Sequence, residues 1–262
     1  MAEAKGERIR VRELTSARDP AFDAAYRLLR RTFPAAELLP KRDWQVVMRE
    51  SEADLWTDIN WHLFVAEWGG KVVGSASGSY LGNVNVGVIG YIAVDPRERA
   101  AGLGPRLRRK LVEAFVEDAN DVRGEPLLAV AGEVEEDNPW LRHLAKHLRA
   151  IPLDFPYLQP ALGVAPAAVP LVLYWQPISD HRRSLPASEV RRLLYTIWRR
   201  MYRVSAPLER PPFRKMMRAL RGRRLIGSRE LTRLPKRPAK LPAKGKIKPK
   251  VRKERSGPGG LE

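Results

Sequence analysis

The first part of the chain carries apolar side chains at strand-like and then at helix-like spacing. Residues 8–14 alternate polar and apolar side chains, as a half-buried strand does. Asp19 followed by Pro20 is typical of a helix start, because the carboxylate can cap the first turn and proline fits the first helical position. Apolar residues then recur at helical spacing up to Pro34, and a second helix can begin at Asp43. The pattern therefore predicts a strand and then two helices.

Three strands in succession are predicted next. They cover residues 62–67, 71–80 and 86–94. Gly69-Gly70 and Gly82-Asn83 fall between them and favour tight turns, so neighbouring strands are expected to pair antiparallel. The third strand is mostly apolar, which is typical of a strand in the middle of a sheet.

Helices and strands alternate in the remaining pattern. An amphipathic helix follows the third strand, another strand is predicted over 127–135, and Asn138-Pro139 begins a further helix. Two later strands are expected near 153–158 and 169–175. A long amphipathic helix is expected over 186–204, and its apolar face should pack on the body.

Composition narrows the class of protein. Of the 262 residues, 44% are hydrophobic, which is enough for a core, and no apolar run approaches the length of a membrane span. The segment Met1–Gly6 lacks the apolar stretch of a signal peptide, so a cytoplasmic protein is expected. The absence of cysteine excludes disulfides, thiolate metal sites and a cysteine nucleophile.

The positive charge is concentrated at the C-terminal end. The net charge is +18, and residues 205–262 hold 19 Lys and Arg against 4 Asp and Glu, so the rest of the chain is nearly neutral. We therefore divide the chain into a domain over 1–180, a helix over 181–204 packed on it, and a basic tail over 205–262. The tail is expected to be largely disordered, with a short amphipathic helix at 211–221.

Three interpretations of the basic tail stay open. Lys and Arg spread along a flexible segment can bind nucleic acid without reading its sequence. The short helix over 211–221 can instead lie on an anionic membrane or on a partner protein. The tail can also be a solubilising extension with no partner.

The segment from Val94 to Gly104 is the most informative part of the sequence. It ends the third strand of the series and contains two glycines just before a helix. The first N–H groups of a helix have no partner within it, and the helix dipole favours negative charge there. Gly102 and Gly104 would let a pyrophosphate approach the backbone. The segment therefore predicts a site for a phosphorylated small molecule.

The order of elements and this segment together resemble the GNAT superfamily of acetyl-CoA-dependent N-acetyltransferases. The family signature is Arg/Gln-x-x-Gly-x-Gly/Ala, and Arg99-Ala100-Ala101-Gly102-Leu103-Gly104 matches it. The resemblance covers about residues 7–177 by element order and is sharpest over 91–107. It implies an α+β fold with a mixed, mainly antiparallel central sheet flanked by helices. The helix over 186–204 then forms a C-terminal helical extension.

The resemblance also assigns contacts with coenzyme A. Backbone N–H groups from Ala101 to Gly104 would bind the pyrophosphate, and the strand edge before them would hydrogen-bond the pantetheine arm. That arm would lie where the strands over 86–94 and 127–135 separate, with Gly132 supplying a bulge. Pro105 removes one N–H donor from the start of the helix. The residues expected at the coenzyme are Ile92, Ala93, Val94, Arg99, Ala100, Ala101, Gly102, Leu103, Gly104 and Pro105.

The catalytic residues depart from the family pattern. Ala145 stands where many members have a tyrosine acid, and Val88 stands where some have a base. Glu133 and Glu135 are candidate bases, because they share one face of the strand beside the expected separation, and Glu133 is the one assigned a catalytic role; both can also belong to a solvated strand end. Tyr157 is a candidate acid or, alternatively, a structural tyrosine. His143 and His147 are spaced like zinc ligands, but they lack a third ligand, so no metal site is expected.

Two functions are compatible with these features. The first is an acetyltransferase that moves an acetyl group from acetyl-CoA, as co-substrate, to a primary amine of a small molecule or a protein. The second is a non-enzymatic protein associated with nucleic acid, in which the GNAT-like domain senses a ligand or acts as a scaffold and the tail binds phosphates. The spacing-specific coenzyme motif favours the first. The sequence leaves the acceptor and the oligomeric state open.

Overall fold

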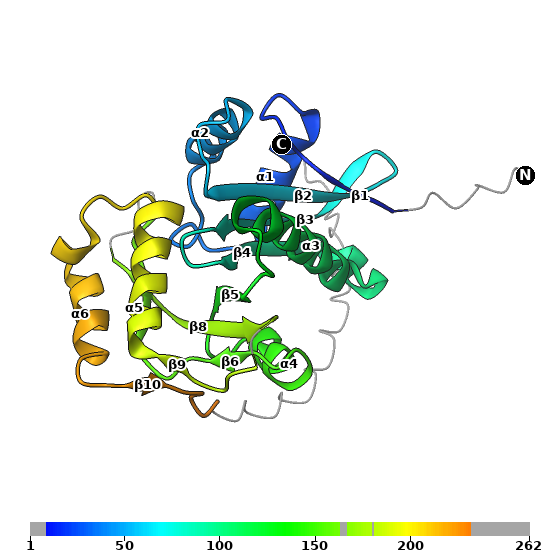
Figure 1. Ribbon diagram of the computed structural model, residues 1–262. Coiled ribbons are helices and arrows are strands. Elements are labelled where there is room, and N and C mark those ends of the chain that lie inside the picture. Colours follow the sequence, from blue (N-terminus) through cyan, green and yellow to red (C-terminus); the bar gives the residue numbers. More distant parts are fainter. Residues whose placement is uncertain (1–8, 163–166, 180, 232–262) are drawn as a thin grey trace, which may run out of the picture. The chain divides into compact units, whose positions relative to one another are not determined.

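The computed structural model describes residues 9–162, 167–179 and 181–231, with the backbone alone at 99–101, and an eight-stranded sheet lies at its centre (Figure 1). The strand order is β1-β2-β3-β4-β5-β8-β6, with β7 also paired to β8. All neighbouring strands are antiparallel except β4 and β5, which are parallel. The strands of this sheet are β1 (Arg10–Glu13), β2 (Ile59–Trp68), β3 (Lys71–Leu81), β4 (Val86–Val94), β5 (Ala129–Val134), β6 (Ile151–Pro152), β7 (Tyr157–Gln159) and β8 (Val169–Pro177).

The expected α+β fold is confirmed, and helices cover both faces of the sheet. The α-helices are α1 (Pro20–Thr32), α2 (Lys41–Glu52), α3 (Leu103–Arg123), α4 (Pro139–His147), α5 (Ala187–Thr196) and α6 (Pro211–Ala219). Helices α1 and α2 pack on one face, against a core that includes Val65 and Tyr91, whereas α3 packs on the opposite face against Ala76 and Ile89. In Figure 1, α3 accordingly crosses in front of the strands that lead to β4.

The helix starts follow the capping residues in the sequence. The Asp19 carboxylate accepts a hydrogen bond from the backbone N–H of Ala21 at 2.9 Å, and Asn138 does the same for Trp140 at 3.0 Å. Helix α2 begins two residues earlier than expected, at Lys41 rather than Asp43, because Pro40 already sets the backbone for its first turn.

A β-bulge interrupts β4 at Gly90. On the β3 side, Ser77 pairs with Tyr91 and the next residue, Gly78, pairs with Ile89, so Gly90 is the extra residue. The bulge shifts the alternation of side chains, and Val88 and Tyr91 therefore face the same side of the sheet.

Strands β4 and β5 separate directly at this bulge. Their parallel register ends at Ile89↔Gly132, and β5 continues along β8 instead. The expected bulge at Gly132 was therefore placed on the wrong strand. Gly132 has a different role, because a Cβ atom there would lie 2.5 Å from the hydroxyl oxygen of Tyr174.

The beginning of the expected basic tail is folded. After α5 the chain forms a π-helical turn (Ile197–Met201), a 3-10 turn (Pro207–Glu209) and then α6. Phe213 of α6 is fully buried, with its ring 5.2 Å from that of Trp198. Strand β10 (Leu225–Ile226) then pairs with β9 (Leu185–Pro186).

The structure therefore corrects the predicted tail boundary. Residues 205–231 belong to the compact unit that ends at Thr232, because the apolar stripe of α6 is buried on it rather than free for a membrane or partner. The remaining part of the predicted disordered tail, 232–262, lies outside the described residues. Across the described ranges, no helix is long and apolar enough to cross a membrane.

His62 of β2 is largely shielded from solvent and lies between two carboxylates, which tie β1, β2 and α3 together. Its Nδ1 lies 2.6 Å from Glu13 and its Nε2 lies 2.7 Å from Asp118. Burial lowers the pKa of His62, but hydrogen bonds to Asp118 and Glu13 outweigh burial and raise it to about 9.

This histidine gives the fold a pH dependence on the alkaline side. The folded-state pKa lies above the unfolded value of about 6.5, so its stabilisation is complete below that value and is lost as pH rises through about 9. We expect His62→Gln to lower the free energy of unfolding by roughly 2–3 kcal/mol at pH 6. That difference should vanish by about pH 10, as measured by urea denaturation at several pH values. A difference that stays constant across this range would contradict a charged His62.

Candidate active site

Two cavities lie on opposite sides of β4 and meet at Gly90. We call the larger one, about 540 Å³ between the separated ends of β4 and β5, the splay cleft. We call the smaller one, about 270 Å³ beneath α2, the aromatic cavity. Gly90 lines both. A molecule in one cavity can therefore approach a molecule in the other at the bulge.

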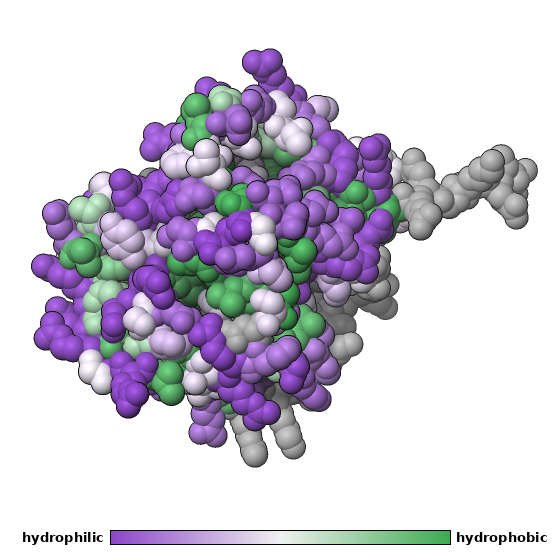
Figure 2. Space-filling model, in the orientation of Figure 1, coloured by the Kyte–Doolittle hydropathy of each residue, from purple (hydrophilic) through white to green (hydrophobic). Residues whose placement is uncertain are grey.

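The splay cleft contains several of the residues expected at the coenzyme. Ile92, Val94 and Gly104 line it, together with Glu133 from β5. The side chain of Ala93 faces the other way, into the core under α1, so only its backbone can contribute to the cleft. Figure 2 shows hydrophobic residues gathered in the middle of this face, between α3 and the strands β5 and β8. The cleft therefore offers apolar walls and the edge of β4 beyond Ile89, which no longer pairs with β5.

The glycine motif forms the start of α3 at the end of this cleft. The backbone makes a 3-10 turn over Pro96–Ala101 and then reverses at Gly102, whose φ of 65° is left-handed and favours glycine. Leu103 and Gly104 are the first helical residues, so their N–H groups have no partner within the helix. A Cβ atom at Gly102 or Gly104 would meet no atom within 4 Å. The start of α3 thus leaves open space where an anion is favoured.

Pro105 and residues 99–101 are the other residues predicted to lie at the coenzyme. Pro105 occupies the third helical position and carries no N–H, as the sequence indicated. The side chains of Arg99, Ala100 and Ala101 lie outside the described residues, and so does any contact that they would make.

Glu133 and Tyr157, the two candidate catalytic residues, lie in contact. The Tyr157 hydroxyl donates a hydrogen bond to one carboxylate oxygen of Glu133, and the Tyr202 hydroxyl donates to the other at 2.6 Å. Tyr157 is 1% exposed, whereas Glu133 is only partly buried because it lines the cleft. The structure thus places a carboxylate between two phenols at the point where β4 and β5 separate.

The surroundings of Glu133 raise its pKa, so that its carboxyl group can gain and lose a proton near neutral pH. Burial is the largest influence on the pKa of Glu133 and raises it. The hydrogen bonds from Tyr157 and Tyr202 lower this pKa, and the nearby Glu37 carboxylate raises it, so that the pKa is about 7. Burial and the neighbouring carboxylate also raise the pKa of Tyr157 and Tyr202 well above the usual value, so both phenols stay protonated. A carboxylate of this kind can serve as a general base at physiological pH.

Tyr202 is a site residue that the sequence did not reveal. It follows the π-helical turn after α5, lines the aromatic cavity, and reaches across to Glu133 in the splay cleft. It was expected only as part of a helix that packs on the body. No local spacing connects it with Glu133, since 69 positions separate the two residues.

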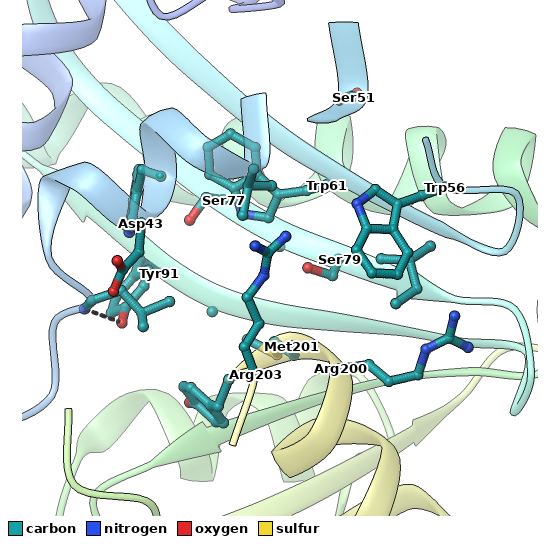
Figure 3. A pocket seen from close by; sticks show the side chains of 17 residues that line it. Asp43, Ser51, Trp56, Trp61, Ser77, Ser79, Tyr91, Arg200, Met201 and Arg203 are labelled. Atoms are coloured by element: carbon teal, nitrogen blue, oxygen red, sulfur yellow. Dashed lines mark hydrogen bonds between the residues drawn. The ribbon is translucent and has the colours of Figure 1, made fainter. Parts of the chain in front are cut away.

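Aromatic side chains form the walls of the second cavity. Trp44 and Trp61 pack edge to face with ring centroids 5.3 Å apart, and Trp44 lies 5.6 Å from Tyr91. In Figure 3, Trp56 and Trp61 lie on the side of α2 and β2, whereas Met201 and Arg203 approach from the C-terminal segment. The full lining consists of Leu39, Asp43, Trp44, Val47, Ser51, Trp56, Ile59, Trp61, Ser77, Gly78, Ser79, Gly90, Tyr91, Arg200, Met201, Tyr202 and Arg203.

Two arginine ion pairs hold the C-terminal segment over this cavity. Arg200 pairs with Asp58, and Arg203 pairs with Glu50, each through two hydrogen bonds. Tyr202 lies between these two arginines in the sequence, so the pairs also fix its position. Within the described parts of the chain, no group of three or more His, Cys, Asp or Glu side chains could hold a metal ion.

Comparison with known proteins bears on both the fold and the family. A structure from Bacteroides thetaiotaomicron described as a GNAT-family acetyltransferase has a TM-score of 0.53 at 17% identity, covering 75% of this chain and 100% of its own. Ard1 from Thermoplasma volcanium (TM-score 0.46, 18% identity, 66% and 99% covered) is a weaker likeness. So is ribosomal-protein-alanine N-acetyltransferase from Brucella melitensis (0.45, 19%, 64% and 99%). At such identity the first likeness shows the fold alone.

The family follows from the sequence comparison. No curated protein matches the chain. Residues 22–148 match the family described as "Acetyltransferase (GNAT) family", a range that contains most of α1, the strands β2 to β5, the glycine motif and Glu133. The family resemblance stated from the glycine motif is therefore confirmed, and this chain contains a GNAT acetyltransferase domain over residues 22–148.

Proposed function

We propose that the protein moves an acetyl group from acetyl-CoA to a primary amine by direct transfer. The observation that carries this proposal is the meeting of two cavities at Gly90, with the Glu133–Tyr202 hydrogen bond beside it. Direct transfer needs a donor and an acceptor that approach from two sides, and a group between them that takes a proton. The splay cleft, the aromatic cavity and Glu133 fit these three requirements.

The donor fits the splay cleft from β4 to the start of α3. The open edge of β4 over Ile92–Val94 can hydrogen-bond the pantetheine arm as a further strand would. The free N–H groups of Leu103 and Gly104 and the positive end of the α3 dipole suit the pyrophosphate. When bound there, acetyl-CoA supplies the acetyl group as a thioester.

Glu133 and Tyr202 would move the protons. Ionised Glu133 takes the proton that the amine nitrogen loses as the new amide bond forms. The departing sulfur needs a proton, and Tyr202 gives one while it accepts the proton held by Glu133. Because its pKa is strongly raised, Tyr202 acts as a relay rather than as a free acid. Tyr157 then has a positioning role, since it holds the second oxygen of Glu133 from the buried side.

An assay for thiol release with acetyl-CoA and a panel of primary amines tests this proposal. We expect release of coenzyme A that depends on the amine, with the acetylated amine identified by mass spectrometry. Calorimetry should show acetyl-CoA binding in the absence of any amine. Failure to bind acetyl-CoA would overturn the proposal.

The nucleic-acid alternative stays a prediction. Part of the positive charge that would bind nucleic acid lies on residues 232–262, which are outside the described residues. Deletion of that segment should abolish retention on nucleic acid and leave acetyl-CoA binding intact if the tail has this role.

A further inference from the structure

Helices α5 and α6 lie side by side and form a helical hairpin (Figure 1). The Phe213 ring of α6 packs 5.2 Å from the ring of Trp198, which follows α5. At the other end of the pair, the Arg191 guanidinium of α5 donates to the carbonyl of Leu220, which caps α6, at 3.5 Å. We call residues 187–221 the basic hairpin.

Exposed arginines give the basic hairpin a positive charge that its carboxylates do not balance. Glu189 of α5 pairs with Arg182 outside the hairpin. The row along α5 and the turn after it contains Arg191 and Arg199, and the row along α6 contains Arg210, Arg214, Arg218 and Arg221. None of these arginines forms an ion pair with a carboxylate in the part of the chain that the structure describes.

The row on α6 lowers the stability of its own helix. Arg210, Arg214 and Arg218 are spaced four positions apart, and like charges at this spacing destabilise a helix. Arg210 is also the N-cap residue, and the first turn of α6 contains no acidic residue, although the positive end of the helix dipole disfavours cations. Residues that act against the stability of their own element are expected where they have a function.

Two other helices of the same protein compensate their exposed cations. On α3, Glu113 lies 2.7 Å from Lys110 and 3.6 Å from Arg109. On α1, Arg30 and Arg31 lie in the last turn, where the helix dipole favours positive charge. The pattern on α6 is therefore specific to this helix and does not follow from a basic composition alone.

Phosphate groups match the row on α6. A guanidinium group is planar and can bind two phosphate oxygens at once, which a solubilising lysine does not do. A membrane would supply phosphates as well, but Phe213 and Met216 of α6 are buried on the body, so the helix cannot insert its apolar side into lipid.

An exposed tyrosine lies within the row on α5. Tyr195 is 43% exposed and lies four positions from both Arg191 and Arg199, so the three side chains share one side of the helix. Its ring is supported edge to face by Phe213, with the centroids 6.3 Å apart. An accessible aromatic ring beside arginines is typical of surfaces on which an unpaired base stacks.

We infer that the basic hairpin binds single-stranded nucleic acid, with phosphates on the arginines of α6 and a base on Tyr195. This binding goes beyond acetyl transfer, because none of the residues assigned to it lines the splay cleft or the aromatic cavity. It is also distinct from binding by residues 232–262, because it places the contacts on folded helices.

Fluorescence anisotropy of a labelled single-stranded oligonucleotide with the full chain, without acetyl-CoA, tests the phosphate contacts. The variant Arg214→Gln/Arg218→Gln/Arg221→Gln should bind at least about 10-fold more weakly at low salt. The slope of log K against log salt concentration should become shallower by about 2, since each phosphate contact on a single strand contributes about 0.7. Arg27→Gln/Arg30→Gln/Arg31→Gln removes the same charge from exposed positions of α1 and should leave both values close to those of the wild type.

A pair of variants at Tyr195 tests the stacked base. Tyr195→Leu keeps an apolar side chain against Phe213 but removes the ring, whereas Tyr195→Phe keeps the ring. We expect Tyr195→Leu to weaken binding of the single strand by about 5- to 100-fold and Tyr195→Phe to bind like the wild type. A duplex of the same sequence should bind all three proteins equally, because its bases are already stacked within it.

Several results would overturn this inference. Equal loss in the α6 and α1 variants would indicate net charge alone, and unchanged binding in the α6 variant would exclude its phosphate contacts. Equal binding of the single strand by Tyr195→Leu and Tyr195→Phe would exclude the stacked base. Loss of all binding on deletion of residues 232–262, with an unchanged melting temperature, would assign it to that segment. Binding to phosphatidylserine vesicles but not to the oligonucleotide would assign the surface to a membrane. If the triple α6 variant does not fold, the salt slopes of Arg214→Gln and Arg218→Gln decide.

Discussion

Glu133→Gln is expected to lower kcat/KM for acetyl transfer by about 10²- to 10⁴-fold, because general-base catalysis contributes that much. The amide keeps the size of the side chain and can still bond Tyr157 and Tyr202, but it cannot take a proton. In the wild-type protein, kcat/KM should rise with pH through about 7, where the raised pKa of Glu133 lies. Steady-state kinetics across this pH range check both expectations.

Two measurements separate loss of the catalytic step in Glu133→Gln from a general effect of removing a carboxylate and from loss of acetyl-CoA binding. Glu136→Gln is the control variant, because it removes an exposed carboxylate close to Glu133 in the sequence. Glu136 pairs with Arg229 at 3.1 Å, and activity should stay near the wild-type level when it is replaced. Acetyl-CoA binding to Glu133→Gln, measured by calorimetry, should also stay close to that of the wild type. Full activity in Glu133→Gln would remove this residue from the mechanism.

The same substitution should make the protein more stable at alkaline pH. The folded-state pKa of Glu133 lies above the unfolded value, so the protonated form is favoured on folding, and stability is lost as pH rises from about 4.5 through about 7. Glutamine avoids this cost, so Glu133→Gln should raise the free energy of unfolding at pH 8 by on the order of 1–3 kcal/mol. A variant that loses activity while gaining stability cannot have lost it by unfolding.

The parts of the fold that sequence predicted well are those with a local cause. Strand β4 begins and ends where expected, because an apolar run between turn residues has few alternatives. The starts of α1 and α4 follow from Asp19 and Asn138, whose side chains cap the next turn. The turn before α3 also has a local cause, since the left-handed backbone at position 102 favours glycine.

The parts that sequence missed depend on contacts between distant residues. Glu133 and Tyr157 were proposed separately, and neither spacing nor composition shows that their side chains would touch, or that Tyr202 would join them. The short helix expected over 211–221 is present as α6, but charge counting placed it in a largely disordered tail. Its apolar residues Phe213 and Met216 are instead fully buried on the body. The bulge at Gly90 likewise results from pairing with β3, which sequence alone does not reveal.

Gly102→Glu is expected to weaken acetyl-CoA binding at least about 100-fold. The added carboxylate would lie at the start of α3, where the pyrophosphate is proposed to bind, so it would occupy the site and repel the ligand. Gly124→Glu is a closely matched control, because Gly124 has the same φ of 65°, caps the other end of the same helix, and has equally open surroundings. Both variants carry the same strain and the same added charge. Calorimetry with acetyl-CoA therefore isolates the effect of position.

Gly102→Glu and Gly124→Glu should also differ in stability, and the variant that binds acetyl-CoA more weakly should be the more stable one. A carboxylate is favourable at the N-terminus of a helix and unfavourable at the C-terminus, by about 0.3–1 kcal/mol in each case. Gly102→Glu should therefore be the more stable variant and the weaker binder. If both bind acetyl-CoA equally well, the start of α3 does not hold the pyrophosphate, and the donor must enter the splay cleft from elsewhere.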